Sequence, residues 1–169
     1  HGFGGRILGP GEPKYLNSPE TSIFQKRSIL YGLPEARSSI VRGRKAILVE
    51  GYTDVLALHQ AGWSQTVATC GTSFTKEQAA TLRRYADTVV LLFDGDTAGR
   101  KAAFKSADIA LAAGLDVRIV RLPKGRDPAD MLLDGEGSAL STGIENAPGL
   151  VASMAEEVAL RGDLRQPNE

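Results

Sequence analysis

Short apolar runs alternate with longer segments of helical spacing through the middle of the chain. Runs of this length and type predict strands buried on both faces of a sheet. The predicted strands cover residues 46–50, 66–70, 88–93 and 116–121, and the predicted helices cover 53–61, 75–86, 97–113 and 129–134. Strands that alternate with helices predict a parallel sheet with helices on both of its faces. The pattern therefore predicts an α/β fold, Rossmann-like, with a four-stranded parallel sheet.

Glycine, proline and hydroxyl residues mark several helix ends. Gly62 and Gly114 follow two of the predicted helices, as glycine does when it ends a helix. Thr75 or Ser73 is placed to cap the first turn of the helix at 75–86. Pro34 predicts the start of a short helix, because proline is tolerated at the first helical position.

The segments that flank the alternating pattern divide the chain into three parts. Residues 1–45 are rich in glycine, proline and basic side chains, and we interpret them as part of an N-terminal basic subdomain. Residues 46–134 form the α/β domain. Residues 135–169 begin with a linker of small residues up to 147, followed by a helix from 148 to 160 with little to pack against, and a solvated tail. That helix is interpreted as the start of a helical domain.

Composition narrows the classes of function. The chain has 169 residues, 20 basic and 20 acidic, so any surface for nucleic acid must be a local patch. One cysteine excludes an internal disulfide and a cysteine-rich zinc site. No apolar stretch approaches the roughly 18 residues that a membrane span needs, so no membrane partner is expected. The N-terminus lacks a signal pattern and begins without methionine, which we interpret as an excised domain of a longer intracellular protein.

Acidic residues follow two of the predicted strands directly. Glu50 ends the first strand, and Asp94 and Asp96 come after the third. Ligands of open parallel sheets bind at the carboxyl ends of the strands, so neighbouring strands would bring these three carboxylates together. Their charges repel, and a divalent cation relieves the repulsion; oxygen ligands favour Mg²⁺ or Mn²⁺. Such a site suits phosphoryl or nucleotidyl transfer.

Two alternatives to a metal site apply to these acids. An aspartate between a strand and a helix often caps the helix, which accounts for Asp96 and partly for Asp94 but not for Glu50, since glutamate caps poorly. The Asp-Gly-Asp-Thr run is also similar to the nucleophile motif of haloacid-dehalogenase phosphatases. That motif has Thr or Val where this chain has Ala98, and its strand is usually the first of the domain.

Two blocks of the sequence resemble the signature of the TOPRIM fold, which serves primases, topoisomerases and some nucleases. They are Val-Glu-Gly-Tyr-Thr-Asp at 49–54 and Phe-Asp-Gly-Asp-Thr-Ala-Gly-Arg at 93–100. Further segments are similar to the catalytic core of DnaG-type bacterial primases. These segments are residues 2–6, 13–21, 24–26 and 30–33. The resemblance extends from about residue 2 to 134.

The resemblance implies roles for particular side chains. The implied catalytic residues are Glu50, Asp94 and Asp96, and the same three with Asp127 are the implied metal ligands. The implied nucleotide- or nucleic-acid-binding residues are Arg6, Lys14, Asn17, Lys26 and Asp54. Glu50 remains either a ligand or a general base. Ala129 stands where the family often has an acid, and Asp130, one place later, is turned by about 100° on a helix, so its role stays open.

The resemblance also implies an activity and partners. The expected function is an RNA polymerase that makes RNA primers for replication from ribonucleoside triphosphates on single-stranded DNA, with Mg²⁺ or Mn²⁺. The expected location is the bacterial cytoplasm, near the nucleoid. A zinc-binding domain and the domain that binds the replicative helicase are absent from this chain. Another TOPRIM enzyme, either a nuclease or a topoisomerase, and a non-catalytic interaction module remain as alternatives.

Overall fold

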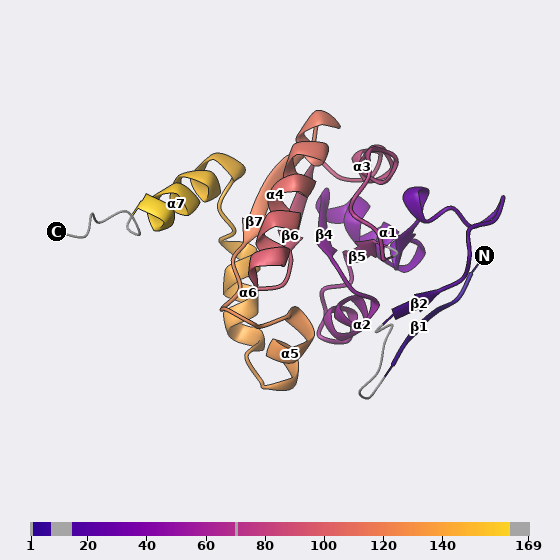
Figure 1. Cartoon of the computed structure of the whole chain (residues 1–169), viewed down its shortest axis with the longest axis horizontal. Helices are drawn as coiled ribbons and strands as arrows, with labels where there is room; N and C mark the ends of the chain where they lie inside the picture. The colour runs from indigo at the N-terminus through magenta and orange to yellow at the C-terminus, as the bar shows by residue number, and fades with distance from the viewer. Residues whose placement is uncertain (1, 8–14, 70, 163–169) are drawn as a thin grey trace.

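The computed structural model describes residues 2–7, 15–69 and 71–162 (Figure 1). The strands are β1 (Gly4–Arg6), β2 (Tyr15–Asn17), β3 (Leu30–Tyr31), β4 (Lys45–Val49), β5 (Thr66–Thr69), β6 (Thr88–Leu92) and β7 (Asp116–Val120). The helices are η1 (Lys26–Ser28, a 3-10 turn), α1 (Leu33–Gly43), α2 (Tyr52–Gln60), α3 (Lys76–Arg83), α4 (Thr97–Ala112), α5 (Pro128–Leu133), α6 (Gly137–Glu145) and α7 (Leu150–Gly162). Every strand and helix predicted over 46–134 is confirmed, with ends that differ by at most about three residues, ordinary for element boundaries.

The main sheet has five strands in the order β3-β5-β4-β6-β7. The four predicted strands, β4 to β7, are parallel to their neighbours, as expected. β3 adds an antiparallel edge strand beside β5 that the sequence pattern did not predict. The strand is only two residues long, Leu30 and Tyr31, so it has no readable alternation of apolar and polar positions.

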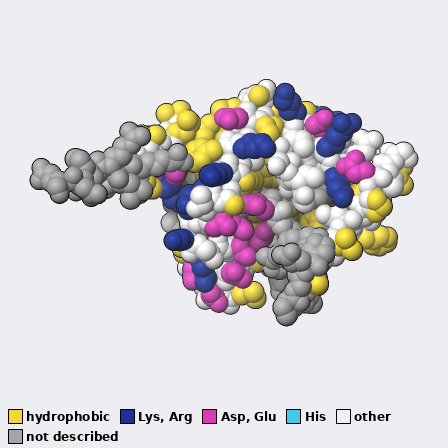
Figure 2. Space-filling model, viewed as in Figure 1, with side chains coloured by type: hydrophobic (Ala, Val, Ile, Leu, Met, Phe, Trp, Pro, Cys, Tyr) yellow, Lys and Arg dark blue, Asp and Glu magenta, His cyan; other side chains and the backbone are white. Residues whose placement is uncertain are grey.

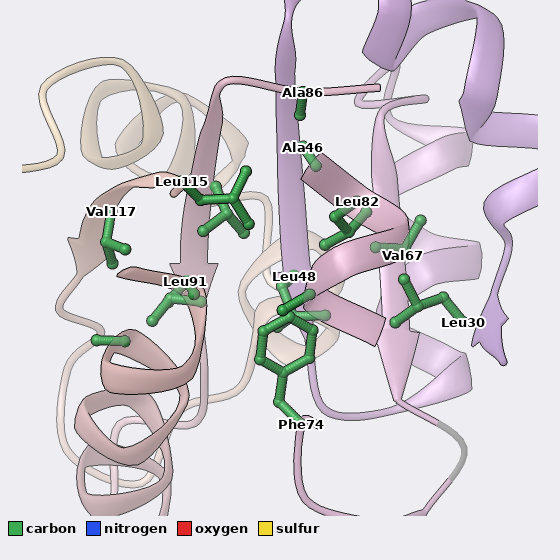
Figure 3. Close-up of a cluster of buried hydrophobic side chains, with 14 of the residues drawn as sticks. Leu30, Ala46, Leu48, Val67, Phe74, Leu82, Ala86, Leu91, Leu115 and Val117 are labelled. Atoms are coloured by element: carbon green, nitrogen blue, oxygen red, sulfur yellow. The ribbon is translucent and has the colours of Figure 1, made fainter. Parts of the chain in front are cut away.

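Helices cover both faces of the sheet, because successive residues of each strand point to opposite faces. On one face Leu48 and Leu91 pack beneath α1, α3 and α4 (Figure 3). On the other face Ile47 and Val90 pack against α2, α5 and α6. Both strands are buried on both sides, which explains why they read as continuous apolar runs.

The predicted helix signals are confirmed at α1 and α3. Pro34 lies in the first turn of α1. Thr75 caps α3, since its side chain accepts a hydrogen bond from the backbone N–H of Gln78 and the Gln78 side chain accepts one from the backbone N–H of Thr75. This reciprocal pair satisfies donors that the first turn of a helix otherwise leaves unpaired.

The prediction of a linker up to residue 147 was wrong. Residues 137–145 form α6, whose Leu140 and Ile144 are buried against the second face of the sheet. Glycine, serine and threonine are poor helix formers, so local propensity argued against this helix. An i, i+4 apolar pair that packs on the sheet supplies the stabilisation that the local sequence lacks.

The helix predicted over 148–160 is confirmed as α7, which projects from one side of the molecule (Figure 1). It is joined to β7 near its start, where the N–H of Ile119 donates to the carbonyl of Pro148, and Ser153 is buried. Val151 and Val158 are largely exposed, in agreement with a helix that has little to pack against. Among the described residues, no helix combines the length and apolar character that a bilayer crossing requires.

Candidate active site

The strand order places the carboxyl ends of β4 and β6 side by side. The two strands pair in parallel with Leu48 opposite Leu91, so Glu50 and Asp94 leave the sheet at the same edge. The chain continues from β4 to β5 on one side and from β6 to β7 on the other. This point is a topological switch, where open α/β sheets bind their ligands. The predicted neighbourhood of the two strand ends is confirmed.

A cavity of about 370 Å³ opens at this switch point. Four carboxylates line it, from the residues that follow β4 and β6, from α2 and from the cap of α5: Glu50, Asp94, Asp54 and Asp127. We call this cavity and its lining the acidic cleft. In Figure 2, acidic side chains gather on one face of the molecule around the region of α4, α5 and α6. Side chains that lie far apart in the sequence therefore supply one concentrated negative charge.

Glu50 is one of the acids of the cleft whose charges repel one another. Its Oε1 atom is buried and has no hydrogen-bond donor among the described residues. Burial raises the pKa of Glu50, and the charges of Asp94 and Asp96 raise that pKa further, while the backbone N–H of Asp94 opposes the shift. A buried carboxylate oxygen without a donor is costly unless a ligand or an ion completes it.

Two glycines hold Asp94 at the strand end. The backbone of Gly95 lies so close to the loop after β7 that a Cβ atom there would come within 1.9 Å of the Pro123 carbonyl oxygen. A Cβ on Gly99 would come within 2.3 Å of the Asp94 carbonyl oxygen. The turn between β6 and α4 is therefore packed against backbone on two sides. Only glycine fits at these two positions without a backbone shift.

Asp96 caps α4 with one carboxylate oxygen. Its Oδ1 atom accepts a hydrogen bond of 2.7 Å from the backbone N–H of Gly99, so the helix-cap interpretation holds for this oxygen. Asp96 is exposed and is not part of the cleft lining, although its charge reaches Glu50. A metal-binding or catalytic role for Asp96 stays a prediction.

Asp54 is buried in the first turn of α2, with 5% of its surface exposed. Its Oδ2 atom accepts a hydrogen bond of 3.1 Å from the backbone N–H of Gly51. Burial, followed by the charges of Asp127 and Asp94, raises the pKa of Asp54 to about 7; the backbone N–H groups of Gly51 and Ala129 oppose the shift. At neutral pH this carboxyl group is thus shared between its neutral and charged forms.

The raised pKa of Asp54 predicts that the protein without metal loses stability as pH rises. The folded state holds the Asp54 proton up to about pH 7, while the unfolded state releases it near 3.8. The stability that Asp54 contributes through this proton is fully present below about pH 4 and is lost as the pH rises past about 7. Between pH 5 and 8, the free energy of unfolding should fall by about 2 kcal/mol less in Asp54→Asn than in the parent. Urea unfolding in chelator at both pH values measures it, and equal slopes for parent and variant contradict it.

Asp127 enters the acidic cleft from the loop after β7. Its Oδ1 atom accepts a hydrogen bond of 2.7 Å from the backbone N–H of Asp130, so it also caps α5. Asp130 itself is exposed and is not among the residues that line the cleft. The preceding residue, Arg126, forms ion pairs with Asp134 and Glu136, and its carbonyl accepts the N–H of Gly95. This network joins the Asp127 loop to the turn that carries Asp94.

The N-terminal hairpin contributes Asn17 to the wall of the acidic cleft. The Tyr52 hydroxyl donates a hydrogen bond to Asn17 Oδ1, and the Tyr52 ring packs on Tyr31, with ring centroids 4.7 Å apart. Lys26 lies in η1, where its carbonyl accepts a hydrogen bond from Gln78, and its side chain is not part of the cleft lining. Lys14 and the side chain of Arg6 lie outside the described residues. The nucleotide-binding roles predicted for these residues stay predictions.

The sequence pattern missed several residues that line the cleft. Tyr52 was noted only as part of a motif and Ser73 only as a possible helix cap, and Thr72 and Lys105 were not singled out. Ala102, Lys105 and Ser106 are spaced i, i+3, i+4 and share one face of α4. That spacing is readable in the sequence, but nothing in it says which face of α4 borders the cleft.

The carboxylates of the acidic cleft fit a magnesium ion only if the ion has further ligands. Among the described residues, no three acid, histidine or cysteine side chains are arranged to hold a metal ion by themselves. Mg²⁺ is usually bound through one or two carboxylates together with water and substrate phosphates. Glu50, with its buried unpartnered oxygen, and Asp94, beside it at the strand ends, match this requirement.

Fold and site define the class of the protein. The Toprim-like family matches residues 47–132, from β4 to α5, and the chain belongs to this family. The family described as "DNA primase catalytic core, N-terminal domain" matches residues 1–37, which include the hairpin beside the cleft. Together the two matches identify the chain as part of the catalytic core of a DnaG-type DNA primase.

Relatives named DNA primase support this identification. The chain is 45% identical to the protein of Clostridium acetobutylicum over 150 residues, which is 89% of the chain and 25% of that protein. It is 44% identical to the protein of Deinococcus radiodurans over 161 residues, 92% of the chain and 28% of that protein. The chain thus spans about a quarter of the length of these relatives.

Solved primase structures share the fold. The Aquifex aeolicus primase structure, with zinc-binding and RNA polymerase domains, matches with a TM-score of 0.85 and 39% identity over 92% of the chain and 39% of its own. A primase domain from Pseudomonas aeruginosa matches with a TM-score of 0.84 and 41% identity over 95% of the chain and 51% of its own. A DnaG catalytic domain bound to single-stranded DNA matches with a TM-score of 0.83 and 40% identity over the same shares.

Proposed function

We propose that this chain carries the nucleotidyl-transfer site of a primase, which joins ribonucleotides into an RNA primer on a single-stranded DNA template. The observation that carries the proposal is the buried, unpartnered Oε1 of Glu50 in a cleft with three other carboxylates. The relatives named DNA primase and the related catalytic domain bound to single-stranded DNA support it. The described fold supplies the acidic cleft, and the primase relatives supply the class of reaction.

In the proposed reaction, the 3′-hydroxyl of the growing strand attacks the α-phosphate of the incoming nucleotide. A phosphodiester bond forms, the bond to the β-phosphate breaks, and pyrophosphate leaves. Mg²⁺ or Mn²⁺, held by Glu50 and Asp94 with Asp96 and Asp127 as further proposed ligands, would lower the pKa of the hydroxyl and neutralise charge on the phosphates. The hydroxyl proton leaves to solvent or to Glu50, for which both roles stay open.

Other residues prepare the acidic cleft for this reaction. Asp54 increases the negative charge beside Asp94 and Asp127, and that charge favours a bound cation. Asn17, which accepts a hydrogen bond from Tyr52, joins the N-terminal hairpin to the cleft wall, and its contact with a nucleotide is part of the proposal. Arg6, Lys14 and Lys26 are proposed to offset phosphate charge.

The partners of the whole protein belong to the proposal as well, because this chain covers only about a quarter of its relatives. The proposed substrates are ribonucleoside triphosphates, the RNA primer and the template strand. Contact with the replicative helicase is assigned to a part of the protein outside residues 1–169, and the proposed location is the bacterial cytoplasm and nucleoid. A nuclease or topoisomerase, or a non-catalytic module, is the alternative that the experiment must separate.

The test is primer synthesis with a labelled strand. A longer chain that adds the remaining domains should extend RNA on single-stranded DNA with Mg²⁺, whereas residues 1–169 alone should initiate little. Glu50→Gln in the longer chain should lower synthesis about 100-fold or more, since metal stabilisation of transition-state charge is worth several kcal/mol. Glu35→Gln, an exposed acid in the first turn of α1, is the matched control and should keep full activity.

Three results would contradict the proposal. Shortening of the labelled strand would identify a nuclease. An unchanged rate in the Glu50 variant would exclude the acidic cleft as the site of the chemistry. Absence of any strand chemistry in the longer chain, with folding intact, would favour the non-catalytic module.

A further inference from the structure

The acidic cleft has a second wall that the proposed chemistry does not use. This wall is formed by residues of α4 and by residues 71–74 before α3, and it includes Lys105, Thr72 and Ser73. Of the described residues that line the cleft, Lys105 alone carries a positive charge. The ammonium group has no ion pair or hydrogen bond within the described part of the chain.

The position of Lys105 on α4 separates it from the acids. Lys105 lies eight positions beyond Thr97, the first residue of the helix, so its Cα atom is about 12 Å along the helix axis from that end. Helical side chains lean toward the N-terminus, which brings the ammonium group back toward the cleft. Lys105 and the four acids therefore line the same cavity from different elements. A ligand that fills this cavity can place an anionic group at Lys105.

The chemistry of this second wall favours a phosphate. A polyanion entering a cleft with four carboxylates is repelled unless a cation compensates it. A lysine ammonium donates charge-assisted hydrogen bonds to phosphate oxygens. The Thr72 and Ser73 hydroxyls add neutral donors on the same wall, in a loop that is exposed to solvent.

We propose that Lys105, with Thr72 and Ser73, forms a phosphate-binding subsite on the α4 wall of the acidic cleft. This inference rests on the proposed function for the identity of its ligand, which is a nucleotide or a nucleic-acid strand. The phosphate belongs either to the triphosphate of the nucleotide or to the backbone of the strand. The experiment separates these two sources.

The experiment measures binding, not catalysis, on the 169-residue chain. GTP with Mg²⁺ and a short oligo(dT) strand are titrated separately against the parent, Lys105→Ala, Lys105→Arg and Lys101→Ala. Lys101 is an exposed lysine on the same helix that does not line the cleft, so its variant removes the same charge elsewhere. Lys105→Ala should weaken one or both ligands by about tenfold, as expected for a lost hydrogen bond to a charged group. Lys105→Arg should keep most of the affinity, and Lys101→Ala should match the parent.

The two sources of phosphate give different results. A loss for the strand, with a salt slope that falls by about 0.7 per lost contact, assigns Lys105 to the strand backbone. A loss for GTP alone assigns it to the triphosphate. Unchanged affinity of Lys105→Ala for both ligands, an equal loss in Lys101→Ala, or no binding of either ligand by the parent overturns the subsite.

The proposed function and this subsite can fail separately. If Lys105→Ala weakens binding and no Mg²⁺-dependent synthesis occurs in the longer chain, the subsite stands and the proposed function falls. If synthesis occurs and Lys105→Ala binds as the parent does, the subsite alone falls.

Discussion

Asp94→Asn is expected to lower the rate of nucleotidyl transfer by about 100-fold or more in a longer chain. The same substitution should not lower the stability of the metal-free protein. The substitution keeps the shape of the side chain and removes one charge. That charge raises the pKa of both Glu50 and Asp54. Its removal therefore relieves repulsion and stabilises the folded protein when no metal is bound. Loss of a metal ligand removes several kcal/mol of transition-state stabilisation. Sites that trade stability for activity behave in this way.

Thermal unfolding measures the metal part of this prediction. Mg²⁺ at ten times its dissociation constant should stabilise the parent by about 1.4 kcal/mol, which raises its unfolding midpoint by roughly 3–5 °C. The midpoint of Asp94→Asn should respond much less. In chelator, the variant should unfold at the same or a higher temperature than the parent. An identical Mg²⁺ response in the two proteins would mean that Asp94 does not bind the metal.

Gly95→Ala is expected to destabilise the protein by about 3 kcal/mol or more, as overpacking against rigid neighbours does. The new Cβ atom would come within 1.9 Å of the Pro123 carbonyl oxygen and 2.8 Å of its carbonyl carbon. These are backbone atoms, so no side-chain rotation relieves the contact. The turn after β6 must shift, and Asp94 shifts with it. Chemical unfolding should show the loss of stability, and primer synthesis in the longer chain should fall with it.

Gly43→Ala is the matched control for this glycine. Gly43 is the last residue of α1, and a Cβ there meets no atom within 4 Å. Alanine in a helix costs less conformational entropy than glycine, so this variant should be as stable as the parent or up to about 1 kcal/mol more stable. Equal, small effects of both substitutions would contradict the tight packing of the turn at Gly95.

Part of the acidic cleft could be predicted from the sequence, because two of its acids directly follow predicted strands. Glu50 and Asp94 follow long apolar runs, and parallel pairing brings such ends to one edge of the sheet. Asp96 was predicted to converge with them, but its oxygen caps α4 and its side chain is exposed. Whether it completes the site stays a prediction, because a local hydrogen bond and a metal compete for the same carboxylate.

Asp54 and Lys105 show what the local pattern could not supply. The pKa of Asp54 depends on its burial and on Asp127 and Asp94, which are distant in sequence and become neighbours only when α2, β6 and α5 pack together. Lys105 faces the cleft only because α4 packs on the sheet by its other faces. Both properties come from long-range contacts.

The sequence by itself determined the alternation of strands and helices, the parallel sheet, and the pair of strand-end acids, because buried parallel strands are continuous apolar runs. Only the tertiary structure decided the antiparallel β3 and the helix α6, since a two-residue strand and a helix of weak formers are stabilised by packing rather than by local preference. It also decided which carboxylates line the cleft and where the single described cation of its wall lies. Charge and burial at a site are set by neighbours in space, which the order of residues along the chain does not specify.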